Sequence, residues 1–322
     1  MGGRLPRSPD VRPRRSARSG CLAISILAAA VAVVACGRPA PTTVVPTEPA
    51  PATAVVPIEP TPFPWILIGE GVDSAVVDAV SGWAADMGMD AQVGSPGAVD
   101  PDGLMAAVGA EAELASVADA WSDEGVLLVV LEPAMMRPGP IVSTIGPETR
   151  LDQAGFLAGL AAGYATKFGG VGLVGGEDGS AFASGFGEGL RYACPRCRLE
   201  SVSDPAAVPF GVDVLVVPPA TDVPTGQAGP GEVWLVLTGS AAPEASQPVA
   251  ARVALVPETL VLAALEALTN GEAGHAWEYG AENGGLQITE LDPEAISPGR
   301  ERLMREAELG LRLGQLVVGG GE

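Results

Sequence analysis

Hydrophobic and polar positions are ordered most regularly in residues 151–197, where they predict helix, strand, turn and helix in succession. In 153–167 three glycines, Gly155, Gly159 and Gly163, recur every four residues and therefore share one helix face. Because glycine has no side chain, this face allows a neighbouring backbone to approach closely. The segment is too short to span a membrane, so the stripe predicts tight packing inside a folded domain.

A short apolar strand and a glycine turn follow this helix. Residues 171–174 form an apolar run bounded by glycines, which is typical of a strand buried on both faces. Gly175 and Gly176 then turn the chain, and Phe182 and Phe186 mark the inner face of a second helix. The turn is at the carboxyl end of the strand, where open parallel α/β sheets bind ligands.

The rest of the folded part alternates between strand and helix patterns, which predicts an α/β fold of two lobes, each with a mainly parallel sheet flanked by helices. We place the first lobe at 65–150, the second at 151–255, and a segment that completes both at 256–322. Further strands are predicted at 65–69, 91–93, 126–131, 141–144, 199–202, 212–217, 233–237 and 286–289. Further helices are predicted at 74–87, 101–122, 260–268 and 297–314, the last with Leu303, Ala307 and Leu311 on its inner face.

The N-terminal residues have the pattern of a secretory signal. Six arginines precede an apolar run from 21 to 34, which is short for a membrane span. The run ends in Val33-Val34-Ala35-Cys36-Gly37, which resembles the lipobox of bacterial lipoproteins. We therefore expect a signal peptide at 1–35 and lipidation of Cys36, with a short uncleaved anchor as the alternative.

Residues 36–64 predict a linker, because prolines, threonines and valines dominate them and cannot form a core. If extended, the 27 residues from 38 to 64 reach about 80 Å at roughly 3.1 Å each.

Charge narrows the class of partner. The chain has 39 acidic and 18 basic residues and a net charge of −21, which argues against nucleic acid, because a phosphate backbone requires a basic face. The same balance predicts a surface that repels anionic lipid.

Cysteine spacing leaves one pair to explain. Cys194 and Cys197 stand three residues apart at the end of a predicted helix, which favours a local disulfide in an extracytoplasmic protein. A redox pair is the alternative, although such sites usually begin a helix. A zinc site lacks further ligands, since the single histidine, His275, is distant and falls in a predicted exposed loop.

Candidate ligand contacts gather at the glycine turn. Gly175, Gly176, Glu177 and Asp178 open a helix, whose free N–H groups can hold an anion or a ribose hydroxyl. The plainer interpretation is that Asp178 or a neighbouring serine only caps the helix. Phe182 faces either the ligand or the core. The sequence shows no serine elbow, histidine pair or metal cluster, so we predict neither an enzyme nor a cofactor.

With these elements placed, two segments resemble the basic membrane protein family, lipoproteins similar to the purine nucleoside receptor A. The central resemblance rests on Phe156–Gly159, Gly172–Gly176, and the residues Phe182, Gly185, Phe186, Gly189 and Tyr192. The C-terminal one rests on Gly280, Gly284-Gly285-Leu286 and Ile296-Ser297.

The resemblance implies a type I periplasmic-binding-protein-like fold and a solute receptor that delivers nucleosides to an ABC permease. Asp73 matches the family's first ligand carboxylate, but Val76 and Val77 stand where the family's base-stacking phenylalanine and asparagine would be. The family's later lysine is also missing, because Lys167 is the chain's only lysine. We therefore keep two hypotheses: a lipid-anchored solute-binding protein on the extracytoplasmic face, or a degenerate lipoprotein that binds no solute.

Overall fold

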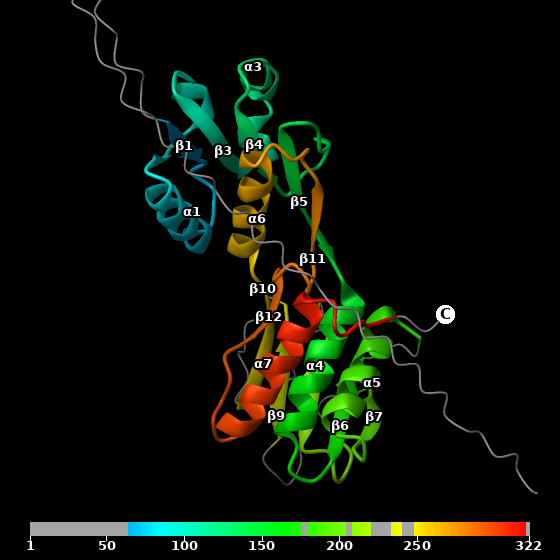
Figure 1. Cartoon of the computed structure of the whole chain (residues 1–322). Helices are drawn as coiled ribbons and strands as arrows, with labels where there is room; N and C mark the ends of the chain where they lie inside the picture. Colours follow the sequence, from blue (N-terminus) through cyan, green and yellow to red (C-terminus); the bar gives the residue numbers. More distant parts are fainter. Residues whose placement is uncertain (1–63, 176–178, 204–207, 220–232, 240–247, 320–322) are drawn as a thin grey trace, which may run out of the picture. The chain divides into compact units, whose positions relative to one another are not determined.

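The computed structural model describes residues 64–175, 179–203, 208–219, 233–239 and 248–319, and these residues form two six-stranded sheets (Figure 1). The predicted signal, Cys36 and the linker lie outside the described residues. Within the described part, no helix has the length and apolar character needed to cross a membrane.

Sheet A is parallel throughout, with the order β11-β5-β4-β3-β1-β2. Its central strands are buried on both faces, which explains their continuous apolar runs. The strands are β1 (Trp65–Ile68), β2 (Asp90–Val93), β3 (Leu104–Ala110), β4 (Leu127–Leu131), β5 (Val142–Thr149) and β11 (Ala276–Tyr279).

Sheet B has the order β12-β10-β9-β8-β6-β7, and only the β10–β12 pair is antiparallel. All five parallel strands therefore begin at one edge and end at the opposite edge. The strands are β6 (Gly170–Val174), β7 (Arg198–Val202), β8 (Val214–Val217), β9 (Trp234–Thr238), β10 (Val249–Leu255) and β12 (Leu286–Thr289).

Helices cover both faces of sheet A. Two long helices, α1 and α6, lie side by side and share one core with β1, β3 and β4 (Figure 1). A second core, which contains Leu114 and Trp121, covers the other face. The helices are α1 (Ser74–Asp86), α2 (Glu111–Leu114), α3 (Ala118–Asp123) and α6 (Pro257–Thr269), with a 3-10 turn η1 (Pro96–Ala98).

Three helices pack on one face of sheet B: α4 (Leu151–Ala165), α5 (Ala181–Ala193) and α7 (Pro298–Arg312). The glycine stripe explains how α4 and α5 meet. A Cβ placed on Gly155 would lie 2.1 Å from the Phe182 carbonyl oxygen, and one on Gly159 would lie 2.2 Å from that of Phe186. Likewise, a Cβ placed on Gly189 of α5 would lie 2.0 Å from the Phe156 carbonyl oxygen. The predicted close packing of this face is confirmed.

The chain passes between the sheets three times in the described part: from β5 to α4, from β10 to α6, and from β11 to β12. The sheet-A half therefore comprises 64–149 and 257–279, and the sheet-B half comprises the described residues of 150–256 and 280–319. Both halves are discontinuous in sequence.

One predicted element is wrong. Residues 101–122 were expected to form a helix, but Leu104–Ala110 form β3, which pairs with β1 and β4 in the middle of sheet A. The run is rich in alanine, which favours helices in isolation. Here its burial between two neighbouring strands decides the conformation, and only α2 and α3 beyond it are helical.

Three smaller differences concern the C-terminal part. The strands β10 and β11 were not predicted from the sequence, since their short runs contain arginine, glutamate and alanine. Leu303 was expected on the inner face of α7 but is 42% exposed. Met304 and Glu308 lie on the buried face instead, beside Ala307 and Leu311.

Candidate functional site

The β1–α1 loop is the first part of the expected ligand edge, since it follows the carboxyl end of β1. Asp73 is exposed and caps α1, because its Oδ1 accepts a hydrogen bond of 2.8 Å from the Ala75 N–H. Val76 is fully buried in the core and Val77 is partly buried against it, so neither position presents a ring to a ligand. In the structure Asp73 is therefore the N-cap of α1, and its contact with a ligand is still a prediction.

Glu113 lies beneath this loop. Its Oε1 accepts a hydrogen bond of 3.0 Å from the Gly71 N–H. Its Oε2 is close to the backbone of Gly69 and Gly109, where added Cβ atoms would lie 2.0 Å and 3.1 Å from it. This oxygen is buried and has no hydrogen-bond partner among the described residues. A buried acceptor without a donor is unfavourable, so a donor brought to this oxygen would stabilise it.

Glu111 organises the loop that follows β4. Its carboxylate accepts hydrogen bonds from the N–H groups of Ala134, Met135 and Met136 at 2.6 to 3.1 Å. These bonds, led by the one from Met136, lower the pKa of Glu111 below its ordinary value. Glu132, at the start of the same loop, adopts a left-handed backbone with φ of 51°. The loop is therefore held in one conformation by a charged acceptor.

Tyr279, at the end of β11, lies near two more carboxylates. Burial raises the pKa of its phenol, and the charges of Glu132 and Glu258 raise it further. Trp277, two residues earlier, is partly buried and its Nε1 has no hydrogen-bond partner among the described residues. His275 is exposed in the preceding loop, as predicted.

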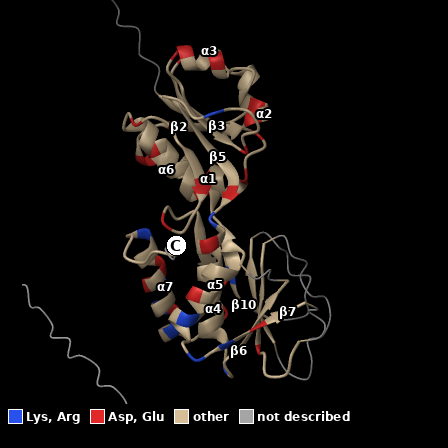
Figure 2. Cartoon of the chain, turned by 90° about the vertical axis from the view of Figure 1, so that its right-hand side faces the viewer, with Lys and Arg blue, Asp and Glu red and all other residues tan. Residues whose placement is uncertain are grey.

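The carboxyl ends of the sheet-A strands thus lead into an acidic and hydrogen-bonding edge. The whole sheet-A half has eighteen acidic residues and one arginine, Arg137. The described residues of the sheet-B half are nearly balanced, with eleven acidic and ten basic ones. Figure 2, in which the ribbon is red at acidic residues and blue at basic ones, shows the same contrast. This field disfavours anionic ligands at the sheet-A edge and favours ligands that donate hydrogen bonds or carry positive charge.

The corresponding edge of sheet B is described only in part. Gly175 directly follows β6 with φ of 59°, and its N–H donates to the Val202 oxygen at 3.0 Å. Gly176, Glu177 and Asp178 lie outside the described residues, so their predicted ligand contacts are not tested. The loops after β8 and β9 likewise continue into 220–232 and 240–247, which are not described.

Two side chains near that turn have structural roles. Ser180 caps α5, because its Oγ accepts a hydrogen bond of 3.1 Å from the Ala183 N–H. Phe182 is only 5% exposed and packs in the main core of sheet B. The core interpretation of Phe182 therefore has structural support, whereas its ligand contact stays a prediction.

A cluster of charges ties together two of the segments that pass between the sheets. Arg150 donates to both carboxylate oxygens of Asp152 at 3.1 and 2.9 Å and to Glu282 at 3.0 Å. These partners, led by Asp152, raise the pKa of Arg150. Gln153, 6% exposed, donates to Glu282 and accepts a bond from the Ala281 N–H. Sequence reasoning missed this cluster, because its partners are about 130 residues apart.

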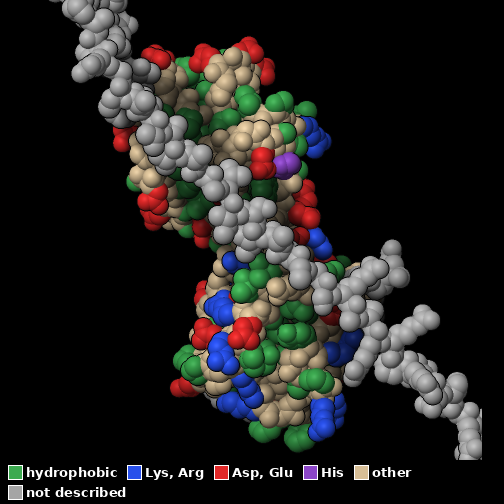
Figure 3. Space-filling view, in the orientation of Figure 1, with side chains coloured by type: hydrophobic (Ala, Val, Ile, Leu, Met, Phe, Trp, Pro, Cys, Tyr) green, Lys and Arg blue, Asp and Glu red, His purple; other side chains and the backbone are tan. Residues whose placement is uncertain are grey.

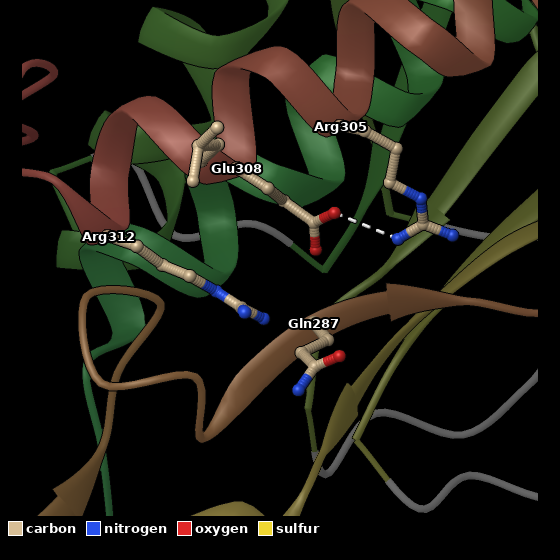
Figure 4. A pocket seen from close by; sticks show the side chains of 5 residues that line it. Gln287, Arg305, Glu308 and Arg312 are labelled. Carbon is tan, nitrogen blue, oxygen red and sulfur yellow. Dashed lines mark hydrogen bonds and ion pairs between the residues drawn. The ribbon is translucent and has the colours of Figure 1, made fainter.

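A hollow between β12 and α7 is visible in Figure 4. Glu308 is 6% exposed, and its oxygens accept bonds from the Ile288 N–H at 2.7 Å and from Arg305 at 2.8 Å. Arg305 also donates to the Ile288 oxygen at 2.7 Å. Since β12 is an edge strand, the two side chains satisfy backbone groups that no neighbouring strand pairs. The hollow is lined by Gln287, Arg305, Glu308, Leu309 and Arg312, and none of these is a predicted ligand residue.

The structure contains a disulfide between Cys194 and Cys197, with a Cα–Cα distance of 5.4 Å, directly after α5. In this state neither sulfur is a free thiol. Among the described residues, no group of three or more His, Cys, Asp or Glu side chains is arranged to hold a metal ion.

Comparison with known proteins establishes the fold. No family model and no curated protein matches the chain. A solved structure of an ABC transporter solute-binding protein from Conexibacter woesei DSM 14684 is similar, with a TM-score of 0.52 and 19% identity over 80% of this chain and 98% of that one.

Two further structures are less similar. A solute-binding protein from Aeropyrum pernix K1 has a TM-score of 0.43 and 15% identity over 81% of this chain and 95% of that one. A transcriptional activator of the comK gene from Bacillus halodurans has a TM-score of 0.48 and 12% identity over 79% of this chain and 99% of that one. The first comparison, together with the two mainly parallel sheets, shows a periplasmic-binding-protein-like fold. The resemblance to the basic membrane protein family stays a prediction.

Proposed function

We propose that this chain is an extracytoplasmic, lipid-anchored solute-binding protein that delivers a small molecule to an ABC permease. The observation that carries the proposal is the fold: two mainly parallel α/β sheets joined by three passages of the chain, similar to a solute-binding protein over almost all of that protein's length. The predicted signal peptide and the predicted Cys36 lipobox support a location outside the cytoplasm and at the membrane.

The joining segments suit a receptor that closes on its ligand. The Arg150 cluster joins the segment after β5 to the segment after β11, so the two connecting segments are bonded to each other. Closure therefore concentrates its backbone changes in a few residues at the ends of these elements, as in other hinged binding proteins.

The ligand we propose is neutral or cationic and rich in hydrogen-bond donors. The buried, unpartnered Oε2 of Glu113 and the acidic sheet-A edge support this class. A nucleoside, which the family resemblance implies, belongs to it, since the ribose hydroxyls and base amino groups are donors. Asp73 and Glu113 are the residues we assign to ligand donors.

Thermal unfolding with ligands tests the proposal. The mature chain from residue 36, with Cys36→Ser to avoid lipidation, contains the compact unit Glu59–Glu322. We expect a neutral or cationic ligand from a nucleoside, amine and sugar panel to raise the unfolding temperature. At a hundredfold excess over Kd the stabilisation is about 2.7 kcal/mol, or roughly 5 to 10 °C.

The assignment of Glu113 needs its own comparison. Glu113→Gln should weaken binding at least about tenfold by removing a charged acceptor. The matched control is Glu124→Gln, an exposed glutamate in the same half, which should leave affinity unchanged. If both variants bind the ligand with the same affinity, Glu113 is not part of the binding site. If no ligand of the panel raises the unfolding temperature of wild type, the proposal of solute binding is contradicted.

A second function is favoured by one observation: Glu113 already fills the space over Gly69 and Gly109, next to the loop that holds Asp73. If that space never opens, the chain is a scaffold lipoprotein that keeps the fold without binding a solute. In that case Glu113→Gln changes unfolding temperature equally with and without the ligand panel.

A further inference from the structure

Two phenylalanines project into solvent at the edge where the parallel strands of sheet B begin. Phe168 is 81% exposed and Phe210 is fully exposed, at 101%. Both precede glycines that touch, because a Cβ on Gly170 would lie 1.8 Å from the Gly211 oxygen. Single exposed apolar residues are common on proteins, but here two exposed phenylalanines lie on adjacent turns at one edge of the sheet.

Both rings are held outward by ordered turns. The buried Asp213, 6% exposed, accepts hydrogen bonds from the Thr166 hydroxyl, the Lys167 N–H and the Phe168 N–H at 2.6, 2.6 and 3.1 Å. Gly211 has φ of 91°, and the Val212 N–H donates to the Pro209 oxygen behind Phe210. The carboxylate of Asp213 thus fixes the turn that presents Phe168.

Basic side chains surround the rings. The Arg198 N–H donates to the Gly169 oxygen at 2.8 Å, and its guanidinium is 3.9 Å from the Cβ position of Gly211. Arg196 lies within the Cys194–Cys197 loop, which the disulfide closes beside Gly169. Two more basic residues lie nearby: Lys167, next to Phe168, and Arg300, whose guanidinium donates to the Tyr164 oxygen. All four basic residues are exposed. We name this surface the aromatic–basic edge: Lys167, Phe168, Arg196, Arg198, Phe210 and Arg300.

Among the described residues, acidic groups near the two rings are few, whereas Asp292, Glu294 and Glu301 lie close in sequence to Arg300. Asp213 is buried and bonded to the turn, and Glu200 is partly buried on β7. Apolar and basic side chains also lie next to each other at the lower end of the sheet-B half in Figure 3. Although the chain has a net charge of −21, the exposed charged residues next to the two rings, Lys167, Arg196 and Arg198, are basic.

We propose that the aromatic–basic edge rests on an anionic lipid surface, with the two rings in the interfacial region and the guanidinium and ammonium groups against lipid phosphates. Exposed aromatic rings with neighbouring basic residues are the chemistry of interfacial membrane binding. Because both phenylalanine rings project from the protein surface, they can insert into the headgroup region of a bilayer. Anionic lipid is repelled by the acidic sheet-A half, so this edge is where attraction is concentrated.

The inference goes beyond solute binding. The inference depends on the proposed lipid anchor only in one respect: the anchor at Cys36 keeps the protein near a membrane, and the predicted linker lets the edge reach it. Vesicle binding and ligand binding are separate measurements, so either proposal can fail alone.

Vesicle flotation tests the inference on the mature Cys36→Ser chain, which carries no lipid. We expect binding to phosphatidylcholine vesicles with about 30 mol% phosphatidylglycerol, and release when salt rises from about 0.05 to about 0.5 M. Phosphatidylcholine alone should bind at least about tenfold more weakly. The double variant Phe168→Ala/Phe210→Ala should lower partitioning about tenfold or more, and Arg196→Gln/Arg198→Gln should remove the preference for phosphatidylglycerol.

Matched controls separate this edge from general stickiness. Two control substitutions should not affect flotation. They are Met135→Ala, at a residue 81% exposed in the sheet-A half, and Arg302→Gln, at an exposed residue of α7. Circular dichroism checks that each variant is folded. Wild type that stays with the soluble fraction at low salt overturns the inference, as does a folded phenylalanine double variant that floats like wild type. If the double variant lowers permease-dependent uptake while wild type ignores vesicles, the edge is a protein contact instead.

Discussion

Gly159→Ala is the sharpest test of how the sheet-B half is built. A methyl group there would lie 2.2 Å from the Phe186 oxygen and 2.7 Å from the Leu190 nitrogen, both backbone atoms of α5. Neither atom can rotate away, so α4 and α5 must separate by about 1 Å to restore van der Waals distance. The close approach of Gly189 to the Phe156 oxygen, where an added Cβ would lie only 2.0 Å away, would be lost in the same movement.

The net effect is a difference between two terms. Alanine favours a helix interior over glycine by about 1 kcal/mol. Overpacking between two helix backbones belongs at the upper end of its usual range, about 3 kcal/mol. We therefore expect the free energy of unfolding to fall by about 2 kcal/mol, and the unfolding temperature by roughly 4 to 8 °C.

Circular dichroism during thermal and urea unfolding measures this loss. Gly187→Ala is the matched control in α5, since its Cβ would approach only the flexible end of Arg191, at 3.2 Å. Gly82→Ala in α1 meets nothing within 4 Å. Both controls should gain about 1 kcal/mol. A Gly159→Ala variant that is as stable as Gly187→Ala would refute the close backbone contact.

Three further changes test other contacts. Asp213→Ala leaves buried donors unpaired and should lower the free energy of unfolding by about 3 kcal/mol in urea titrations; wild-type stability would contradict this. Glu308→Ala should cost about 2 kcal/mol by freeing an edge-strand N–H and a partner arginine, whereas Glu306→Ala, on the exposed side of α7, should cost less than about 0.5 kcal/mol. The lowered pKa of Glu111 means that its ionised form favours the native loop. Its contribution is therefore complete above the ordinary carboxyl pKa and is lost as pH falls through the lowered native value. The hydrogen-exchange protection factors of amides 134–136, which correct for the pH dependence of intrinsic exchange, should fall over that acidic range in wild type, whereas Glu111→Gln should show low protection already at neutral pH.

Long periodic segments were predictable because their pattern is local. The glycine stripe of 153–167 specified both a helix and its closely packed face, and the apolar runs at 171–174 and 233–237 specified buried strands. By contrast, β3 was read as a helix. Its alanines favour a helix, and it is the pairing with the flanking strands β1 and β4 that makes this run a strand.

The candidate site was less predictable than the fold. Asp73 could be found from its place after a strand, but Glu113 and Glu111 acquire their roles from loops that precede or follow them by more than twenty residues. The Arg150 cluster joins residues about 130 positions apart. No local pattern signals such contacts, because they depend on which strand ends become neighbours in the sheet.

By itself, the sequence determined the α/β class, the glycine-mediated packing of one helix pair and the acidic charge of the chain, and it predicts a secretory N-terminus. Tertiary structure decided the rest: that β10 and β11 complete the sheets, that Glu113 lies beneath the first loop, and that basic and aromatic side chains gather at one edge of sheet B. The reason is physical. Periodicity acts over one or two turns of chain, whereas burial and charge act between whichever segments the sheets bring together.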